Sequence, residues 1–287
     1  MQENFVQCLS PTGLHNMHYT EWGQRANPRI VICVHGLTRN CRDFDALAQS
    51  LAHDFRVVCP DIVGRGQSDW LADKQYYGLP QYLADINTLL ARLTAEAEHE
   101  SEHDILWVGT SMGGMIGMML ASLPGTPVRK LVLNDVGTLI PKASLERIGK
   151  YVGKAPAFKT LEDANAYVRY VSASFGPLTD AQWDHLTRHN AKQNADGAWI
   201  MNYDPGIAAP FQLGPINDID LWNHYDRITC PTLLLRGADS DLLLQDTARA
   251  MTQRGPRARL VEFAGIGHAP MLLADDQITV VREFLTA

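Results

Sequence analysis

The sequence lacks the features that direct a chain to membranes or nucleic acids. No window of its 287 residues is apolar over the length that a bilayer requires, and its start, Met1-Gln2-Glu3-Asn4, has no basic segment followed by an apolar one. It has no run rich in Lys or Arg, and its formal net charge is −7. We therefore expect no membrane insertion, no nucleic-acid partner, a cytoplasmic location and a small molecule as ligand.

Paired cysteines are also lacking. The five cysteines are odd in number and without metal-type spacing, and four lie in or beside apolar stretches: Cys33, Cys41, Cys59 and Cys230. This pattern is typical of reduced, buried thiols. The histidines show no convincing metal-ligand spacing either, so we expect no metal site and no cofactor. The oligomeric state is not predicted.

Short apolar runs alternate with helical periodicity along most of the chain. The expected strands are residues 30–34, 55–59, 104–108, 130–134, 231–236 and 259–263. The expected helices are residues 44–52, 79–97, 112–123, 243–254 and 275–285, and residues 5–9 and 17–21 suit an edge hairpin. Such alternation predicts an α/β fold with a mainly parallel sheet and helices on both faces.

The alternation stops between residues 138 and 226, where helical segments dominate: 142–152, 161–174 and 179–193. We expect an inserted helical cap at 138–226 and a core domain made of residues 1–137 and 227–287. Ligand sites in such sheets lie beyond the carboxyl ends of the strands.

Ser111 lies at the centre of Gly109-Thr110-Ser111-Met112-Gly113, between a predicted strand and a predicted buried helix. A turn this sharp needs small residues on both sides, because neighbouring Cβ atoms would collide, and it exposes the hydroxyl at its apex. We therefore expect Ser111 to be a nucleophile, which needs a base and a third group to orient that base.

His268 is the expected base, because it lies in a glycine-flanked loop directly after the last predicted strand, at the same sheet edge as Ser111. The orienting acid should follow another strand end. Asp239 and Asp241 both follow the strand at residues 231–236, and Asp241 is favoured.

With these residues in this order, the whole chain resembles the α/β-hydrolase fold family, in which Ser, Asp and His occur in that chain order. The acid of that family follows strand seven, three residues after a glycine, where this sequence has Ser240. Asp241, which precedes three leucines, best restores the pattern. Asp239 stays an alternative. Asp135 is another, because it follows the strand at residues 130–134, which corresponds to strand six of the family, and some members take the acid from that strand.

The resemblance also implies two backbone N–H donors for an oxyanion. One belongs to Met112, directly after the nucleophile. The other belongs to Leu37, in the loop after the strand at residues 30–34, which corresponds to strand three of the family. Structural roles within loops are implied for His35, Asp61 and Arg65.

Two further sets of residues are left open. Arg39 and Asn40 either face the pocket or cap the helix that follows. The aromatic residues of the cap either line an apolar site or form the core of the cap itself: Trp183, Trp199, Tyr203 and Phe211.

Together these features predict a cofactor-independent serine hydrolase that cleaves a small to medium carboxylic ester through an acyl-enzyme. In this prediction Ser111 attacks the carbonyl, His268 moves the proton and Asp241 holds the imidazolium. The same residues in similar capped proteins cleave carbon–carbon bonds of diketone-like compounds, lactones or amides. These reactions stay open as alternatives, as does a ligand receptor on the same fold.

Overall fold

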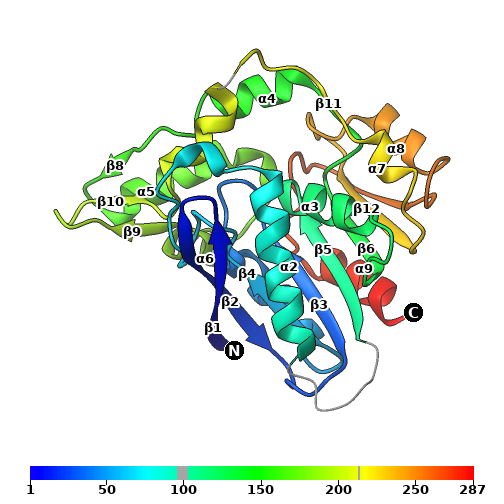
Figure 1. Cartoon of the computed structure of the whole chain (residues 1–287). Coiled ribbons are helices and arrows are strands. Elements are labelled where there is room, and N and C mark those ends of the chain that lie inside the picture. Colours follow the sequence, from blue (N-terminus) through cyan, green and yellow to red (C-terminus); the bar gives the residue numbers. More distant parts are fainter. Residues whose placement is uncertain (96–102, 213) are drawn as a thin grey trace.

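The computed structural model describes residues 1–95, 103–212 and 214–287, and its centre is an eight-stranded sheet (Figure 1). The strand order is β1-β2-β4-β3-β5-β6-β12-β13. The strands are β1 (Gln2–Ser10), β2 (Gly13–Trp22), β3 (Arg29–Val34), β4 (Arg56–Pro60), β5 (Asp104–Thr110), β6 (Val128–Asn134), β12 (Thr232–Gly237) and β13 (Arg259–Phe263). β2 pairs antiparallel with β1 and β4, whereas the other neighbours run parallel. The expected hairpin and mainly parallel sheet are confirmed.

Alternation of side chains along the strands gives the sheet two buried faces. In β3, Ile30, Ile32 and Val34 face one core, while Val31 and Cys33 face the other, and all five are fully buried. A strand covered on both faces must be apolar throughout, which is why it forms an unbroken apolar run in the sequence.

Helices cover both faces of the sheet, as expected. One core includes side chains of α2 (Leu79–Ala95), α3 (Met112–Ala121), α7 (Trp222–Tyr225) and α8 (Gln245–Met251), and the other includes those of α1 (Asp45–Leu51) and α9 (Asp275–Thr286). The expected helix 79–97 is thus present to Ala95, and its last two residues lie outside the described residues. Within the described part of the chain, none of the helices is long and apolar enough to cross a membrane.

The segment between β6 and β12 adds no strand to the main sheet in its described residues. Besides α7, its elements are β7 (Leu139–Ile140), α4 (Lys142–Gly149), β8 (Ala157–Phe158), α5 (Leu161–Val171), η3 (Ala173–Phe175), α6 (Asp180–Asn190), β9 (Ala191–Gln193), β10 (Trp199–Met201), η4 (Pro205–Gln212) and β11 (Ile219–Asp220). Besides the expected helices, the segment contains two small sheets, with strand orders β8-β10-β9 and β11-β7. Strands of two or three residues are too short to show alternation, so the sequence did not reveal them. That residues 138–226 form a separate domain stays a prediction.

Candidate active site

Ser111 lies in a strained turn between β5 and α3, with φ 52° and ψ −116°. The flanking glycines allow this turn. A Cβ on Gly109 would lie 2.3 Å from the Gly113 carbonyl oxygen, and one on Gly113 would lie 2.0 Å from the Val34 carbonyl oxygen. The expected steric requirement for glycine is therefore met at both positions, and the packing of α3 against β3 and β5 holds the serine at the strand end.

Ser111, His268 and Asp135 form a continuous chain of hydrogen bonds. His268 Nε2 lies 3.0 Å from Ser111 Oγ, and His268 Nδ1 lies 2.7 Å from Asp135 Oδ2. Because a carboxylate only accepts hydrogen bonds, Nδ1 carries the proton and Nε2 is left to accept the serine proton. The expected contact between Ser111 and His268 is thus present in the structure.

The loop that carries His268 is fixed from two sides. Ser174, from the segment between β6 and β12, donates its hydroxyl to the His268 carbonyl oxygen at 2.6 Å. Asn134, the last residue of β6, donates its amide to the Pro270 carbonyl oxygen at 2.8 Å. These bonds hold the imidazole next to the serine although it lies on a loop.

Asp135 is fully buried and begins the loop after β6, with φ 52°. Its Oδ1 accepts the Gly237 N–H at 2.8 Å, and its Oδ2 accepts the Ser240 hydroxyl at 2.6 Å besides the His268 N–H. Three donors therefore surround one carboxylate, which satisfies a buried negative charge and fixes its orientation.

The expectation that Asp241 contacts His268 is wrong. The Asp241 side chain is 53% exposed and forms an ion pair with Arg147 at 2.6 Å, and Asp239 is exposed as well. Ser240 occupies the inward position of this turn and donates to Asp135. Of the three acids considered, Asp135 is the one that the fold brings to the histidine. A serine at the usual acid position, with an aspartate directly after β6, was the sequence signal for this arrangement.

The two expected oxyanion donors lie beside Ser111. Met112 is the first residue of α3, where backbone N–H groups have no partner within the helix. Leu37 lines the same cavities as Ser111. Arg65 is fully buried and supports both: its Nε donates to the Leu37 carbonyl oxygen at 2.8 Å, and its Nη2 lies 3.7 Å from the Met112 sulfur.

His35 and Asp61 have the loop contacts that their expected structural roles require. Burial lowers the pKa of His35 to about 4, so the ring is neutral: Nδ1 donates to the Gly36 carbonyl oxygen and Nε2 accepts the Ile62 N–H. Asp61 accepts from the Cys41 N–H and from His18. Burial opposes its ionisation, but the bond from His18 and other favourable contacts keep the pKa of its carboxyl below the ordinary value.

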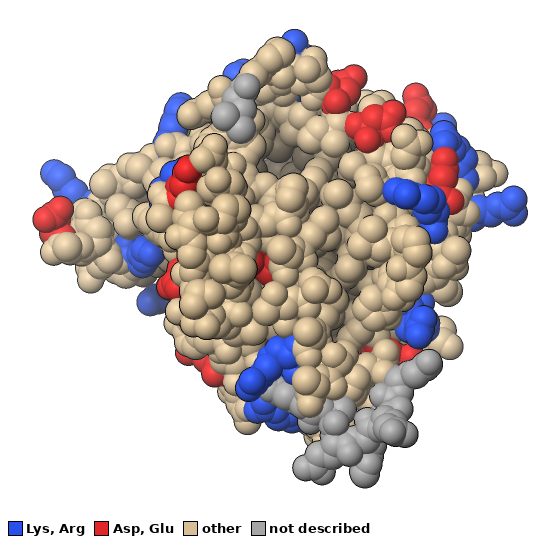
Figure 2. Space-filling model, viewed as in Figure 1, with Lys and Arg blue, Asp and Glu red and all other residues tan. Residues whose placement is uncertain are grey.

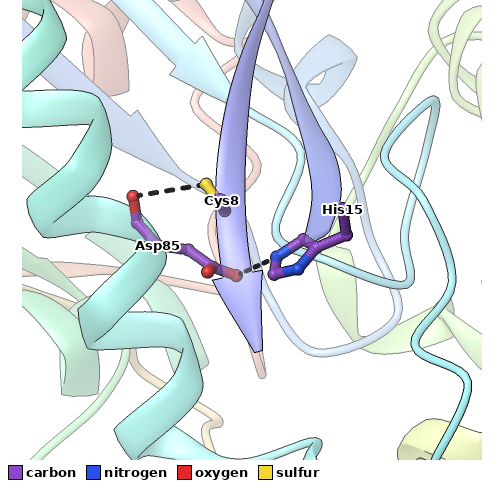
Figure 3. Close-up of side chains that lie close together, drawn as sticks. All are labelled: Cys8, His15 and Asp85. Carbon is purple, nitrogen blue, oxygen red and sulfur yellow. Dashed lines mark hydrogen bonds and ion pairs between the residues drawn. The ribbon is translucent and has the colours of Figure 1, made fainter. Parts of the chain in front are cut away.

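Three groups of side chains in the described residues have the spacing of metal ligands, and none includes Ser111, Asp135 or His268. One of them, Cys8, His15 and Asp85, lies between the β1–β2 hairpin and α2 (Figure 3). His15 Nε2 bonds Asp85 Oδ2 at 3.0 Å, and Gln81 donates to Asp85 Oδ1 at 2.7 Å. The bond from His15 and a bond from the Gln81 amide to the Leu9 carbonyl oxygen, at 3.0 Å, hold the hairpin on the helix.

Two cavities meet at Ser111. One of about 350 Å³ is almost entirely apolar and lies between the amino end of α2, α4 and η4. The other, called the polar cavity, measures about 80 Å³, and its wall combines polar and apolar residues and includes His268. Figure 2 shows a hollow between α4 and the amino end of α2, surrounded mostly by uncharged residues.

The residues left open by the sequence now have positions. Arg39 lines the polar cavity, whereas the Asn40 side chain is buried and donates to the His189 carbonyl oxygen. Phe211 lines the apolar cavity. Trp183 and Tyr203 are buried in the core, and Trp199 is half-buried in β10.

Comparison with known proteins gives one family model and several relatives. A model of the alpha/beta hydrolase family matches residues 31–282. The 3-hydroxybutyrate-oligomer hydrolase of Cupriavidus necator is 48% identical over 290 aligned residues, covering 98% of this chain and 97% of that protein. An esterase of Mycobacterium tuberculosis is 26% identical over 85% of this chain and 78% of its own length. The solved structure of an alpha/beta hydrolase from Novosphingobium aromaticivorans has a TM-score of 0.86 at 36% identity, covering 99% of this chain and 98% of that one.

Proposed function

The chain belongs to the alpha/beta hydrolase family and is an enzyme; from this premise we propose that it is a serine hydrolase that cleaves short oligomers of 3-hydroxybutyrate at their ester bonds. The observation that carries the proposal is the hydrogen-bonded chain of Ser111, His268 and Asp135 at the meeting point of two cavities. A serine, a neutral imidazole and a buried carboxylate in this order are the parts that nucleophilic attack on a carbonyl requires.

The substrate class is proposed from the relative of Cupriavidus necator, because the identity of 48% extends over 98% of this chain. The cavities support this choice. Each 3-hydroxybutyrate unit carries a methyl branch and an ester carbonyl, so an uncharged acyl part suits the apolar cavity of about 350 Å³ beside Ser111.

In the proposed first step, Ser111 Oγ attacks the ester carbonyl carbon while His268 Nε2 accepts the hydroxyl proton. Asp135 stabilises the imidazolium that forms, and the N–H groups of Leu37 and Met112 donate to the oxyanion. Loss of one such donor typically costs about 3 to 4 kcal/mol of transition-state stabilisation. His268 then gives the proton to the leaving alcohol oxygen as the carbon–oxygen bond breaks, which leaves the acyl group on Ser111.

In the second step a water molecule takes the place of the alcohol. His268 Nε2 accepts a proton from this water as its oxygen attacks the acyl carbonyl carbon. The bond to Ser111 Oγ then breaks, and His268 returns the proton to the serine. The products are one carboxylic acid, one alcohol and the unchanged enzyme.

Hydrolysis of the linear 3-hydroxybutyrate dimer and trimer tests this proposal, with monomer release measured by liquid chromatography. The wild type should hydrolyse both, and Ser111→Ala should reduce kcat at least about 10³-fold at unchanged thermal stability. A vinylogous diketone and a lactone are run beside the oligomers. Turnover of either without turnover of any linear ester would overturn the proposal, and so would tight binding of the dimer without turnover, which is the behaviour of a receptor.

A further inference from the structure

The two cavities at Ser111 differ in the chemistry of their walls. The apolar cavity is lined by residues such as Met112, Met115 and Phe211. The polar cavity also has apolar residues in its wall, but it adds the charged side chains Arg39, Asp43 and Arg147, together with His268. A substrate that spans Ser111 therefore places one half in an apolar cavity and the other half beside two arginines.

His268 decides which half of the substrate occupies which cavity. The ring gives its proton to the leaving alcohol, so that alcohol must lie beside His268. His268 lines the polar cavity, and it is absent from the wall of the apolar one among the described residues. The acyl half therefore occupies the apolar cavity, and the leaving alcohol occupies the polar one. This assignment rests on the proposed function.

The two arginines reach the polar cavity from different parts of the fold. Arg39 lies in the loop after β3 and bonds Asp43 through Nε and Nη2, at 2.7 and 2.6 Å. Arg147 lies on α4 and bonds Asp241 in the same way, at 2.6 and 2.9 Å. In both pairs Nη1 is outside the bidentate contact, so each guanidinium keeps N–H donors for a further acceptor.

The charge balance of this cavity favours an anion. Its wall has two guanidinium groups but one carboxylate, that of Asp43, because Asp241 does not line it. The pair between Arg147 and Asp241 is half exposed, with side chains 41% and 53% accessible. An exposed pair of this kind contributes little, so an incoming carboxylate can share or replace Asp241 at low cost.

We propose that Arg39 and Arg147 form a subsite for the free carboxylate of the leaving group. In the last ester of a 3-hydroxybutyrate oligomer, two carbons separate the alcohol oxygen from the terminal carboxylate. An alcohol oxygen beside His268 therefore places that carboxylate within the narrow cavity of about 80 Å³. A longer leaving group would have to extend beyond this cavity, so the subsite favours cleavage of the ester nearest the carboxyl end and release of one monomer at a time.

A matched pair of substrates tests the subsite: the linear dimer as free acid, and the same dimer with a carboxamide in place of the carboxylate. Both carry the same scissile ester. In the wild type, kcat/KM for the acid should exceed that for the amide by about 10-fold or more, because a bidentate, charge-assisted contact is lost in the amide. Arg147→Gln should lower this acid-to-amide ratio by about threefold or more, through a higher KM for the acid.

Two further variants complete the design. Arg39→Gln should also lower the acid-to-amide ratio, and the amide rate reports any disturbance of the neighbouring oxyanion loop. Arg188→Gln changes an exposed arginine of α6 and should leave the ratio as in wild type. An unchanged ratio in both Arg147→Gln and Arg39→Gln would overturn the subsite while ester hydrolysis stands. If the wild type hydrolyses no ester at all, the proposed function fails instead.

The direction of cleavage gives an independent readout. A trimer labelled with ¹³C in its carboxyl-terminal unit should release labelled monomer first, together with unlabelled dimer. Release of unlabelled monomer first, or of labelled and unlabelled monomer at equal rates, would overturn the assignment of the leaving group to the polar cavity.

Discussion

Replacement of Asp135 by Asn distinguishes the proposed triad acid from its rivals. Oδ1 of the carboxylate accepts a hydrogen bond from the backbone N–H of Gly237. Oδ2 accepts hydrogen bonds from the side chains of Ser240 and His268. The Gly237 N–H can only donate a hydrogen bond. The oxygen of the introduced Asn must therefore face Gly237, and its NH₂ must face His268 Nδ1. His268 then has to accept at Nδ1 and carry its proton on Nε2, where it cannot take the proton of Ser111.

The cost follows from this change of tautomer. The corresponding substitution in a serine-protease triad lowers kcat about 10⁴-fold, which is about 5.4 kcal/mol in the activation free energy. We expect a loss of this size for Asp135→Asn, in kcat rather than in KM. The size and shape of the side chain are retained, so the variant should remain folded.

The assay uses the neutral dimer amide, so that the charged subsite does not contribute. Initial rates are measured for Asp135→Asn, Asp239→Asn and Asp241→Asn, and thermal unfolding confirms that each variant is folded. Asp239 and Asp241 are exposed, so their variants should retain kcat within about twofold. The reasoning is refuted if Asp135→Asn retains kcat within about tenfold, or if Asp241→Asn shows the large loss.

Three other predictions concern the parts that support the site. Gly113→Ala should lower the free energy of unfolding by about 3 kcal/mol or more in urea titration, because its Cβ would lie 2.0 Å from the Val34 carbonyl oxygen, whereas Gly214→Ala, with nothing within 4 Å, should change little. Arg65→Lys should lower kcat about 10- to 100-fold with little change in KM, because the bond to the Leu37 carbonyl oxygen is lost; equal effects on both constants would contradict a positioning role. The pKa of buried His35 is about 4 when folded and about 6.5 when unfolded, so its contribution to stability is complete above about pH 6.5 and falls by about 3 kcal/mol by pH 4. His35→Gln should make urea stability less steep over this range, and an unchanged slope would count against it.

The sequence predicted the sheet and the position of Ser111 because both depend on local patterns. The buried strand at residues 30–34 is apolar throughout, and the turn at Ser111 needs Gly109 and Gly113 whatever the rest of the chain does. His268 was also found, since a loop after the last parallel strand must lie at the same edge of the sheet as Ser111.

The residue that contacts His268 is Asp135, one of the alternatives, and not the favoured Asp241, because this contact depends on which way side chains point at two strand ends. Asp135 and Asp241 both follow strands, and spacing alone could not separate them. Backbone φ of 52° at Asp135 directs its carboxylate inward, where Ser240 donates to it, while the turn after β12 leaves Asp241 facing Arg147. Tertiary contacts determine these side-chain orientations, and the sequence pattern does not show them. The short strands between β6 and β12 were not predicted from the sequence for a similar reason, because these segments are strands only through their pairing with each other in the folded chain.

Labelling with a fluorophosphonate tests the central claim, that ester hydrolysis proceeds through Ser111, most directly. The wild-type enzyme is titrated with the probe, hydrolysis of the 3-hydroxybutyrate dimer is followed at each point, and the modified peptide is identified by mass spectrometry. We predict that one equivalent modifies Ser111 and that activity falls in proportion to this modification. Dimer hydrolysis that persists after Ser111 is fully modified would contradict the account.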